Sequence, residues 1–158
     1  MHLPLIRKVF ENKEIQLVPI MVGELNNQNL EEYGKIFQRY LQDPRNLFII
    51  SSDFCHWGNN FDYKPYDRNK GEIFEYIEDL DRTGMGLIER HDLSGFLNYL
   101  ERTENTICGR NPISIAISTI LHSNLPLRTS FIRYAQSNPV RRQSEFSVSY
   151  ATSVSVLE

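Results

Sequence analysis

The sequence runs Leu47-Phe48-Ile49-Ile50-Ser51-Ser52-Asp53-Phe54-Cys55-His56-Trp57-Gly58 at the point that decides the fold. Its first four residues are an unbroken apolar run, which predicts a strand buried on both faces. The run then turns polar, and open α/β sheets bind ligands at the carboxyl ends of such strands. A carboxylate, a thiol, an imidazole and the chain's only tryptophan follow there. The stretch therefore predicts both a central strand and the best candidate site.

The segments before this stretch predict a βαβ unit. Residues 15–22 (IQLVPIMV) predict a strand, in which Pro19 favours a position near an edge or a bulge. Residues 27–41 carry apolar and aromatic side chains at the i, i+3, i+4, i+7 spacing of an amphipathic helix. The order strand, helix, strand implies a parallel pair with a right-handed crossover. A further helix is predicted at residues 3–10, at the beginning of the sequence.

The segments after the stretch predict three more helices. Apolar spacing predicts helices at residues 71–83 and 91–100, with a break at Gly84 between them. Asn111-Pro112 predicts the start of the third helix, with Asn as the N-cap and Pro at the first helical position. This helix is expected to cover residues 113–122.

The end of the chain predicts an antiparallel pair of strands, at residues 127–136 and 146–156. Together with the predicted parallel pair, these strands indicate the α/β class, with a mixed sheet flanked by helices. The 158 residues fit a single domain, residues 1–158.

Composition excludes several classes of function. A net charge of −3 gives no general electrostatic reason to bind nucleic acid or an acidic membrane. No apolar run approaches the roughly 20 residues that a membrane span needs, which argues against membrane insertion. The two cysteines form no CxxC pair and suit a reducing compartment, and the N-terminal stretch does not resemble a signal peptide. These features predict a cytoplasmic protein, with the nucleus as an additional location.

Cys108 and Arg110 form a second candidate cluster, just before the predicted helix at residues 113–122. Exposed backbone N–H groups and a nearby guanidinium both favour a thiolate, which could be a metal ligand, a nucleophile or a redox-active group. The structural alternative is a small buried cysteine that packs in a turn. Arg110 could hold a carboxylate or a phosphate at the helix end.

His56 could be a metal ligand, a general acid or base, or a hydrogen-bonded structural histidine. Asp53 could orient His56 or act as a ligand itself. Cys55 alternates with its neighbours and is expected to point into the core. The remaining histidines, His2, His91 and His122, are expected to be surface or capping residues.

Several motifs resemble the Memo family, named for a role as mediator of receptor-tyrosine-kinase-driven cell motility. The motifs span nearly the whole chain. They are Met1-His2-Leu3-Pro4, Asn46-Leu47-Phe48, Ser51 to Gly58, Gly71-Glu72-Ile73, Thr106 to Ile113, Tyr134 to Ser137 and Val148 to Ala151.

This resemblance implies a fold related to the class III extradiol dioxygenases (LigB-type), here lacking its N-terminal half. It implies binding of copper or iron, with Cys108, His56 and Asp53 as the metal-site residues. It also implies binding of phosphotyrosine peptides from receptors or adaptors, for which we assign His56, Cys108, Arg110 and Trp57.

The sequence departs from the family pattern in two ways. It begins at the family's internal MHLP, so the upstream strands and two pocket histidines are absent, and Asn111 stands where the family tends to have histidine. Loss of neighbouring strands should leave an unpaired sheet edge and an exposed core face, which favours self-association. We therefore expect a C-terminal portion, a short isoform, an incomplete gene model or a degenerate copy.

The leading functional hypothesis is a cytosolic signalling or interaction module with a redox-capable metal pocket. A metal-dependent dioxygenase or oxidase of the extradiol type is the second hypothesis. Iron extradiol chemistry uses two histidines and a carboxylate, and this sequence offers Asp53 and His56 without a clear third ligand. A truncated, inactive copy is the third.

Overall fold

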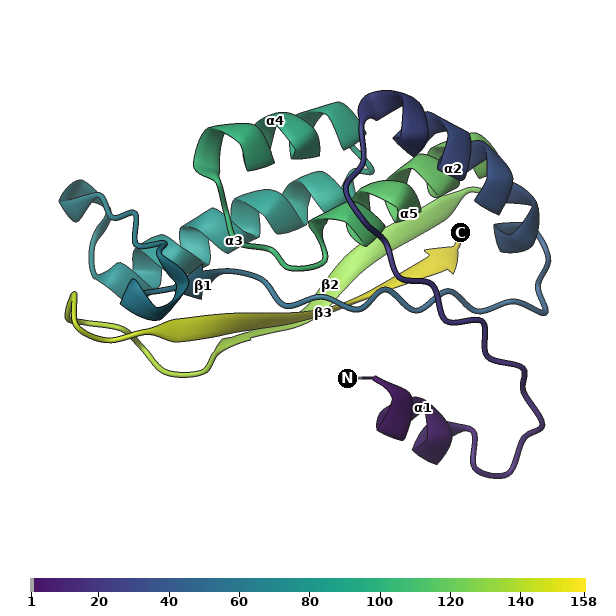
Figure 1. Ribbon diagram of the computed structural model, residues 1–158, viewed down its shortest axis with the longest axis horizontal. Coiled ribbons are helices and arrows are strands. Elements are labelled where there is room, and N and C mark those ends of the chain that lie inside the picture. Colours follow the sequence, from purple (N-terminus) through teal and green to yellow (C-terminus); the bar gives the residue numbers. More distant parts are fainter. Residues whose placement is uncertain (1) are drawn as a thin grey trace.

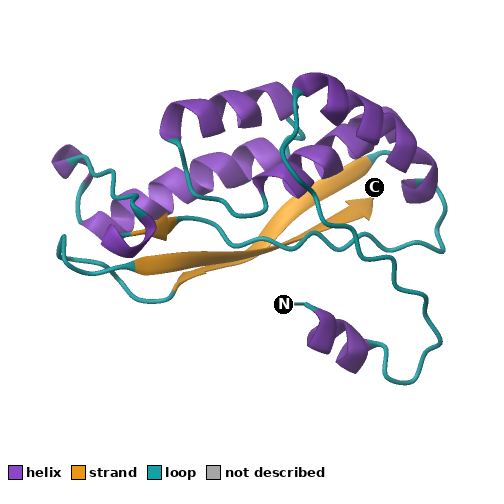
Figure 2. Cartoon of the chain, viewed as in Figure 1, coloured by secondary structure: helices purple, strands orange, loops and turns teal. Residues whose placement is uncertain are grey.

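Helices on one side of a small sheet make up most of the computed structural model, which describes residues 2–158 (Figure 1). This range contains five α-helices and three strands. The elements are α1 (Leu3–Val9), α2 (Asn27–Leu41), β1 (His56–Trp57), α3 (Ile73–Glu89), α4 (Leu93–Thr103), α5 (Arg110–Ser123), β2 (Leu127–Gln136) and β3 (Ser147–Leu157), with short 3-10 helices at Asn59–Phe61 and Arg68–Lys70. Helices α2 to α5 lie above the sheet, whereas α1 lies apart from them below it (Figure 2).

The sheet has the strand order β1-β3-β2, and all its pairs within residues 2–158 are antiparallel. The long β2–β3 ladder runs from the Leu127–Leu157 pair to the Gln136–Ser149 pair, with a bulge between Phe131 and Arg133. The two predicted C-terminal strands are therefore confirmed. The predicted mixed sheet is wrong for the described residues, because the expected parallel pair does not form.

The two segments of the predicted parallel pair, residues 15–22 and 47–50, run as extended chain without a strand assignment. Most of their apolar side chains face solvent: Met21 is 99% exposed and Leu47 is 69% exposed, whereas Phe48 is half-buried against Phe37. A strand forms only when a neighbouring chain satisfies its backbone groups, and neither segment has such a neighbour among the described residues. The prediction of a strand buried on both faces is wrong here, whereas the expected exposed apolar surface is present.

Helix α2 begins and ends where the amphipathic pattern predicted. Asn26 is its N-cap, and the Asn26 side chain accepts a hydrogen bond from the Asn29 N–H at 2.8 Å. The buried face of α2 carries Leu30 and Gly34. Ser118 of α5 donates a hydrogen bond to the Leu30 carbonyl at 2.9 Å, so α2 is held against α5.

Helix α3 continues through Gly84, where the sequence had predicted a break, and ends at Glu89. Gly84 lies against the Tyr99 ring of α4, and a Cβ atom at this position would come within 2.9 Å of Tyr99 Cε1. The glycine therefore allows the two helices to approach, rather than ending the first one.

Helix α5 begins two residues earlier than predicted, at Arg110 in place of Pro112, with Gly109 as the N-cap in place of Asn111. Asn111 lies within the first turn, and its side chain donates to the Gly23 carbonyl at 2.9 Å. The capping role predicted for Asn111 is therefore wrong, because its amide ties α5 to the extended chain before α2.

The core lies between α3, α4, α5 and the sheet. Trp57, Ile77, Phe96 and Ile107 have no exposed surface. Burying one such side chain contributes roughly 1.5–3 kcal/mol. Two of these residues belong to the loops that carry the candidate site, so core packing fixes the site from beneath.

Candidate functional site

The first site loop, residues 51–57, is held at the end of the sheet by β3. The Phe54 N–H donates to the Ser149 carbonyl, and the Ser149 N–H donates to the Cys55 carbonyl, both at 2.9 Å. Phe54 and Cys55 are buried, whereas Asp53 and His56 are half-buried. The expected inward direction of Cys55 is confirmed, and burial raises the pKa of its thiol far above the ordinary range.

The second site loop, residues 104–110, lies beside the first and runs in the opposite direction. The Gly109 N–H donates to Ser52 Oγ at 2.9 Å. At the other end, the His56 N–H donates to Thr106 Oγ1 at 2.7 Å, and Thr106 Oγ1 donates to the His56 carbonyl at 3.0 Å. These bonds bring together segments about 50 residues apart in the sequence.

Cys108 has an exposed thiol at the centre of this contact. Its Sγ accepts a hydrogen bond from the Asp53 N–H at 3.0 Å and lies 3.9 Å from Ser52 Oγ. The predicted proximity of Asp53 and Cys108 is therefore present, and it is made by the Asp53 backbone. The sulfur position is set by the neighbouring loop.

His56 lies beside Thr106, two residues before Cys108. Its Nδ1 is 3.0 Å from the Thr106 carbonyl oxygen, and its ring packs edge-on against Phe61 at a centroid distance of 5.2 Å. Both contacts fix the orientation of the imidazole. Only one ring nitrogen, Nε2, is left to meet a ligand.

The residues proposed as metal ligands do not form a complete site on their own. Across residues 2–158, no group of three or more His, Cys, Asp or Glu side chains gathers closely enough to hold a metal ion. Cys108 offers a soft thiolate and His56 an imidazole, both of which suit copper or iron. The described part of the chain therefore supplies ligand types for such a metal without enclosing it.

Two further predicted site residues have different surroundings. Arg110 is exposed at the first turn of α5, and its guanidinium lies 4.0 Å from the exposed Glu24 carboxylate. Such an exposed pair holds little energy, so the guanidinium is accessible to other anions. Trp57 was predicted as a peptide-binding residue, but its indole is fully buried and donates to the Pro65 carbonyl at 2.9 Å. Trp57 therefore supports the site from the core.

Asp81 of α3 is a residue that the sequence reasoning missed. It is fully buried, and its Oδ1 accepts hydrogen bonds from the Cys55 N–H at 3.2 Å and from Asn105 Nδ2 at 3.0 Å. Burial raises the pKa of Asp81, and hydrogen bonds from Ser149, Asn105 and Tyr134 oppose the rise. Asp81 lies four residues after Ile77, on the apolar stripe of α3, and this spacing could have identified it.

The other histidines each make one side-chain contact. His2 Nδ1 lies 2.7 Å from Ser51 Oγ, His91 Nε2 lies 2.6 Å from Thr129 Oγ1, and His122 Nδ1 lies 2.8 Å from the Ser118 carbonyl. All three histidines are half-buried; His2 is the N-cap residue of α1 and His122 lies in the last turn of α5, in line with the predicted surface or capping positions. His2 reaches the beginning of the first site loop.

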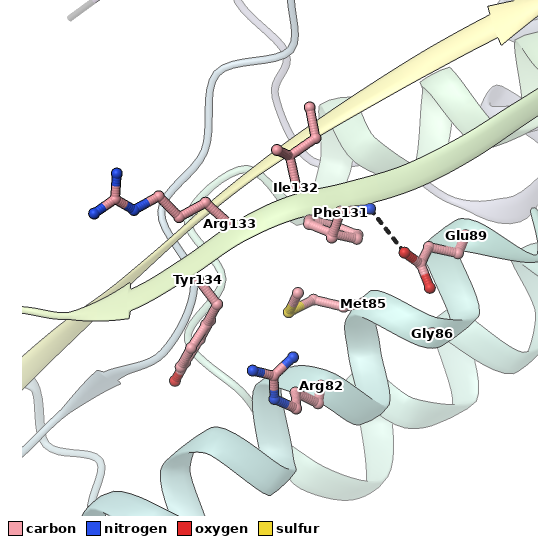
Figure 3. A pocket seen from close by; sticks show the side chains of 8 residues that line it. All are labelled: Arg82, Met85, Gly86, Glu89, Phe131, Ile132, Arg133 and Tyr134. Carbon is pink, nitrogen blue, oxygen red and sulfur yellow. Dashed lines mark hydrogen bonds between the residues drawn. The ribbon is translucent and has the colours of Figure 1, made fainter.

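Two hollows in the described part of the chain lie away from these loops. One, of about 210 Å³, lies between α3 and β2 and is lined by Arg82, Met85, Glu89 and Tyr134, among others (Figure 3). Another, of about 470 Å³, lies between α2, α4 and α5. The lining of neither contains Asp53, His56 or Cys108. On the two site loops, Asp53 and His56 are half-buried and Cys108 is exposed.

None of the helices found in residues 2–158 is long and apolar enough to cross a membrane. The fold is a mixed α/β structure in which two neighbouring loops carry a thiol, an imidazole and a guanidinium.

Comparison with known proteins gives the family. A family profile described as Memo-like protein matches residues 1–154. Over 156 residues the chain is 49% identical to Protein MEMO1 of Danio rerio and 46% identical to Protein MEMO1 of Homo sapiens, in each case covering 96% of this chain and 52% of the relative. Over 159 residues it is 46% identical to Protein memo-1 homolog of Caenorhabditis elegans, covering 98% of this chain and 45% of the relative. The chain belongs to the Memo-like family, and it spans about half the length of the curated relatives it matches.

Proposed function

We propose that this Memo-like chain is a signalling or interaction module that binds phosphotyrosine-containing peptides of receptors or adaptors at its two site loops. The observation that carries the proposal is the exposed Arg110 guanidinium at the first turn of α5, two residues after the exposed Cys108 thiol. A guanidinium binds phosphate through two parallel hydrogen bonds. Because His56 Nδ1 faces the Thr106 carbonyl and must donate to it, His56 Nε2 would donate to a phosphate only as the imidazolium. The module would act in the cytosol and the nucleus.

The test is fluorescence anisotropy with a labelled phosphotyrosine peptide library and its unphosphorylated counterpart. We expect wild type to prefer the phosphorylated library, and Arg110→Gln to lose that preference by about tenfold or more, since a hydrogen bond to a charged group contributes roughly 1.5–3 kcal/mol. His56→Ala should also weaken binding of the phosphorylated library relative to wild type. Arg128→Gln, at an exposed arginine of β2, is the matched control. Equal binding of both libraries by wild type would refute the proposal.

We propose copper or iron binding as a second property of the same loops, with Cys108, His56 and Asp53 as the ligands. The soft thiol and the imidazole support this proposal, and further ligands would come from residues outside the described cluster. Calorimetric titration of wild type and Cys108→Ala with each metal tests it. Binding that is lost in the variant supports a thiolate ligand. Identical titrations of the two proteins exclude Cys108 from the site.

The enzymatic alternative is a dioxygenase of the extradiol type, to whose LigB-type fold we propose this domain is related. Asp53 and His56 lie on one loop and would supply two of the three ligands, one carboxylate and one histidine, that iron extradiol chemistry uses. Oxygen-dependent cleavage of a catechol after addition of iron would favour this alternative. A folded chain that binds no peptide and no metal, and cleaves no catechol, would be an inactive copy.

We further propose that the chain associates with itself through its unpaired extended segments. Leu47 and Ile49 are exposed on such a segment. The outer edge of β2 is protected, because the Glu89 carboxylate accepts the Phe131 N–H at 2.7 Å beside the bulge (Figure 3). Light scattering should show an oligomer that Ile49→Lys dissociates and that Leu121→Lys, at an exposed leucine of α5, leaves intact. A monomeric wild type would contradict this proposal.

A further inference from the structure

One buried carboxylate connects the two site loops. Asp81 Oδ1 accepts a hydrogen bond from the first loop, through the Cys55 N–H, and another from the second loop, through Asn105 Nδ2. Both donors contact the same oxygen atom. Each donor immediately precedes a member of the His56–Thr106 contact, so Asp81 lies directly behind the point where the loops meet.

The other carboxylate oxygen ties this junction to the sheet. Asp81 Oδ2 accepts the Tyr134 O–H of β2 at 3.0 Å, and Tyr134 Oη lies 3.2 Å from Ser149 Oγ of β3. Ser149 in turn exchanges backbone hydrogen bonds with Phe54 and Cys55. The carboxylate thus joins α3, both site loops and two strands.

The buried position of Asp81 does not favour a role in stabilising the fold as a whole. The carboxylate is fully buried, and within residues 2–158 it has no salt-bridge partner. Burying an unpaired charge is costly, and an apolar residue of similar volume often stabilises such a position. A carboxylate does what an apolar residue cannot, because one of its oxygens accepts from two segments at once.

The orientation of Asn105 supports this reading. Its side chain is buried, and Nδ2 donates to both Asp81 Oδ1 and Tyr99 Oη. The amide oxygen of Asn105 has no hydrogen-bond partner among the described residues. The opposite orientation of the amide would place that oxygen against the Asp81 carboxylate. The contact with Asp81 therefore decides how the second loop is held, although one acceptor is left unsatisfied.

We propose that Asp81 is a positioning residue, which sets the separation between the loop that carries His56 and the loop that carries Cys108 and Arg110. The inference rests on the proposed function where it concerns ligand binding, since it addresses the same loops. It deepens that function by assigning the spacing of the binding groups to a residue that touches no ligand.

Formation of a disulfide between the loops measures their separation without any ligand. Ser52 Oγ lies 3.9 Å from Cys108 Sγ, so Ser52→Cys places a thiol beside Cys108. In a glutathione buffer the two thiols form a disulfide while glutathione disulfide is reduced to two glutathione molecules. The equilibrium gives the effective concentration of one thiol at the other, which falls when the loops separate.

The expected results separate positioning from stability. In the Ser52→Cys background, Asn105→Ala and Asp81→Ala should each lower the effective concentration about tenfold, the loss expected for one hydrogen bond to a charged group. Tyr134→Phe removes a hydrogen bond to the same carboxylate but leaves both loop contacts, so its effective concentration should differ from that of the Ser52→Cys parent by less than about twofold. Asp81→Asn should also stay within about twofold of the parent, because its amide oxygen still accepts from both donors. The measurements are made without denaturant and at a temperature well below the unfolding transition, so that unfolding of the whole chain does not contribute.

Equal effective concentrations in Asn105→Ala, Tyr134→Phe and the parent would overturn the inference, and so would equal losses in all the variants. If Asp81→Ala does not fold, the comparison of Asn105→Ala with Tyr134→Phe still decides. Peptide binding by the same variants without the Ser52→Cys change is measured separately. A wild type that binds no phosphotyrosine peptide removes the proposed function and leaves the disulfide result standing.

Discussion

Replacing Gly34 by alanine tests how closely α2 and α5 approach. Gly34 is buried in the middle of α2. A Cβ atom at this position would collide with Ser118 Oγ and come within 3.0 Å of the Ser118 carbonyl carbon. Ser118 cannot simply rotate away without loss, because its hydroxyl donates to the Leu30 carbonyl at 2.9 Å. The helices must therefore move apart to accept the methyl group.

Two effects of opposite sign decide the magnitude. Alanine is favoured over glycine in a helix interior by about 1 kcal/mol. Overpacking a close contact costs about 1–3 kcal/mol, and here the cost includes the Ser118 hydrogen bond. We expect the clash to exceed the gain, so that Gly34→Ala lowers the free energy of unfolding by up to about 2 kcal/mol.

Gly86→Ala is the matched control. It lies in the interior of α3, and its added Cβ would meet only the end of the flexible Arg90 side chain, at 3.3 Å. The helix propensity should therefore act alone and raise the free energy of unfolding by about 0.5–1 kcal/mol. Urea unfolding followed by far-ultraviolet circular dichroism measures both variants. Stabilisation by Gly34→Ala to the same degree as by Gly86→Ala would refute the close approach of α2 and α5.

Three further outcomes follow from the described contacts. A thiol reagent should modify one cysteine per folded chain, the exposed Cys108, and should reach buried Cys55 only after unfolding; mass mapping that finds Cys55 modified first would contradict the burial. Burial raises the pKa of Asp81, so the folded state binds its proton more tightly than the unfolded state does. The free energy of unfolding of wild type relative to Asp81→Asn should therefore increase as the pH falls through the pKa of the folded carboxyl. A decrease over this pH range in urea unfolding would contradict the raised pKa. Finally, Asp92 caps α4 by accepting the Gly95 N–H at 2.9 Å, so Asp92→Ala should cost about 0.5–2 kcal/mol in thermal or urea unfolding, and no loss would place the cap elsewhere.

Local patterns determined much of the secondary structure. The apolar stripe of residues 27–41 predicts α2 with its observed bounds, and alternation predicts the β2–β3 pair. Both predictions succeed because one face of each element packs against a neighbour, and the apolar side chains of that face recur at the period of the helix or strand. The position of Cys108 just before α5 follows from the same kind of reasoning.

The sequence proposed candidate site residues but could not give their contacts. The sequence singled out Asp53, His56 and Cys108, yet the structure joins them through the Asp53 backbone and through Thr106. Backbone donors carry no distinguishing side chain, so no residue type in the sequence reveals them. The burial of Trp57 was missed for a similar reason, because an aromatic residue beside a polar loop fits both a binding surface and a core.

The sequence by itself determined which segments favour helix, which favour strand and which residues bear reactive groups. Tertiary structure alone decided whether the apolar run at residues 47–50 became a strand, because strand formation depends on a hydrogen-bonding neighbour that no local pattern supplies. It also decided that Gly84 lies inside a helix, where it makes room for Tyr99, and that Asp81 lies behind both site loops. Each of these outcomes depends on a contact between residues distant in the chain, and such contacts exist only once the elements have packed.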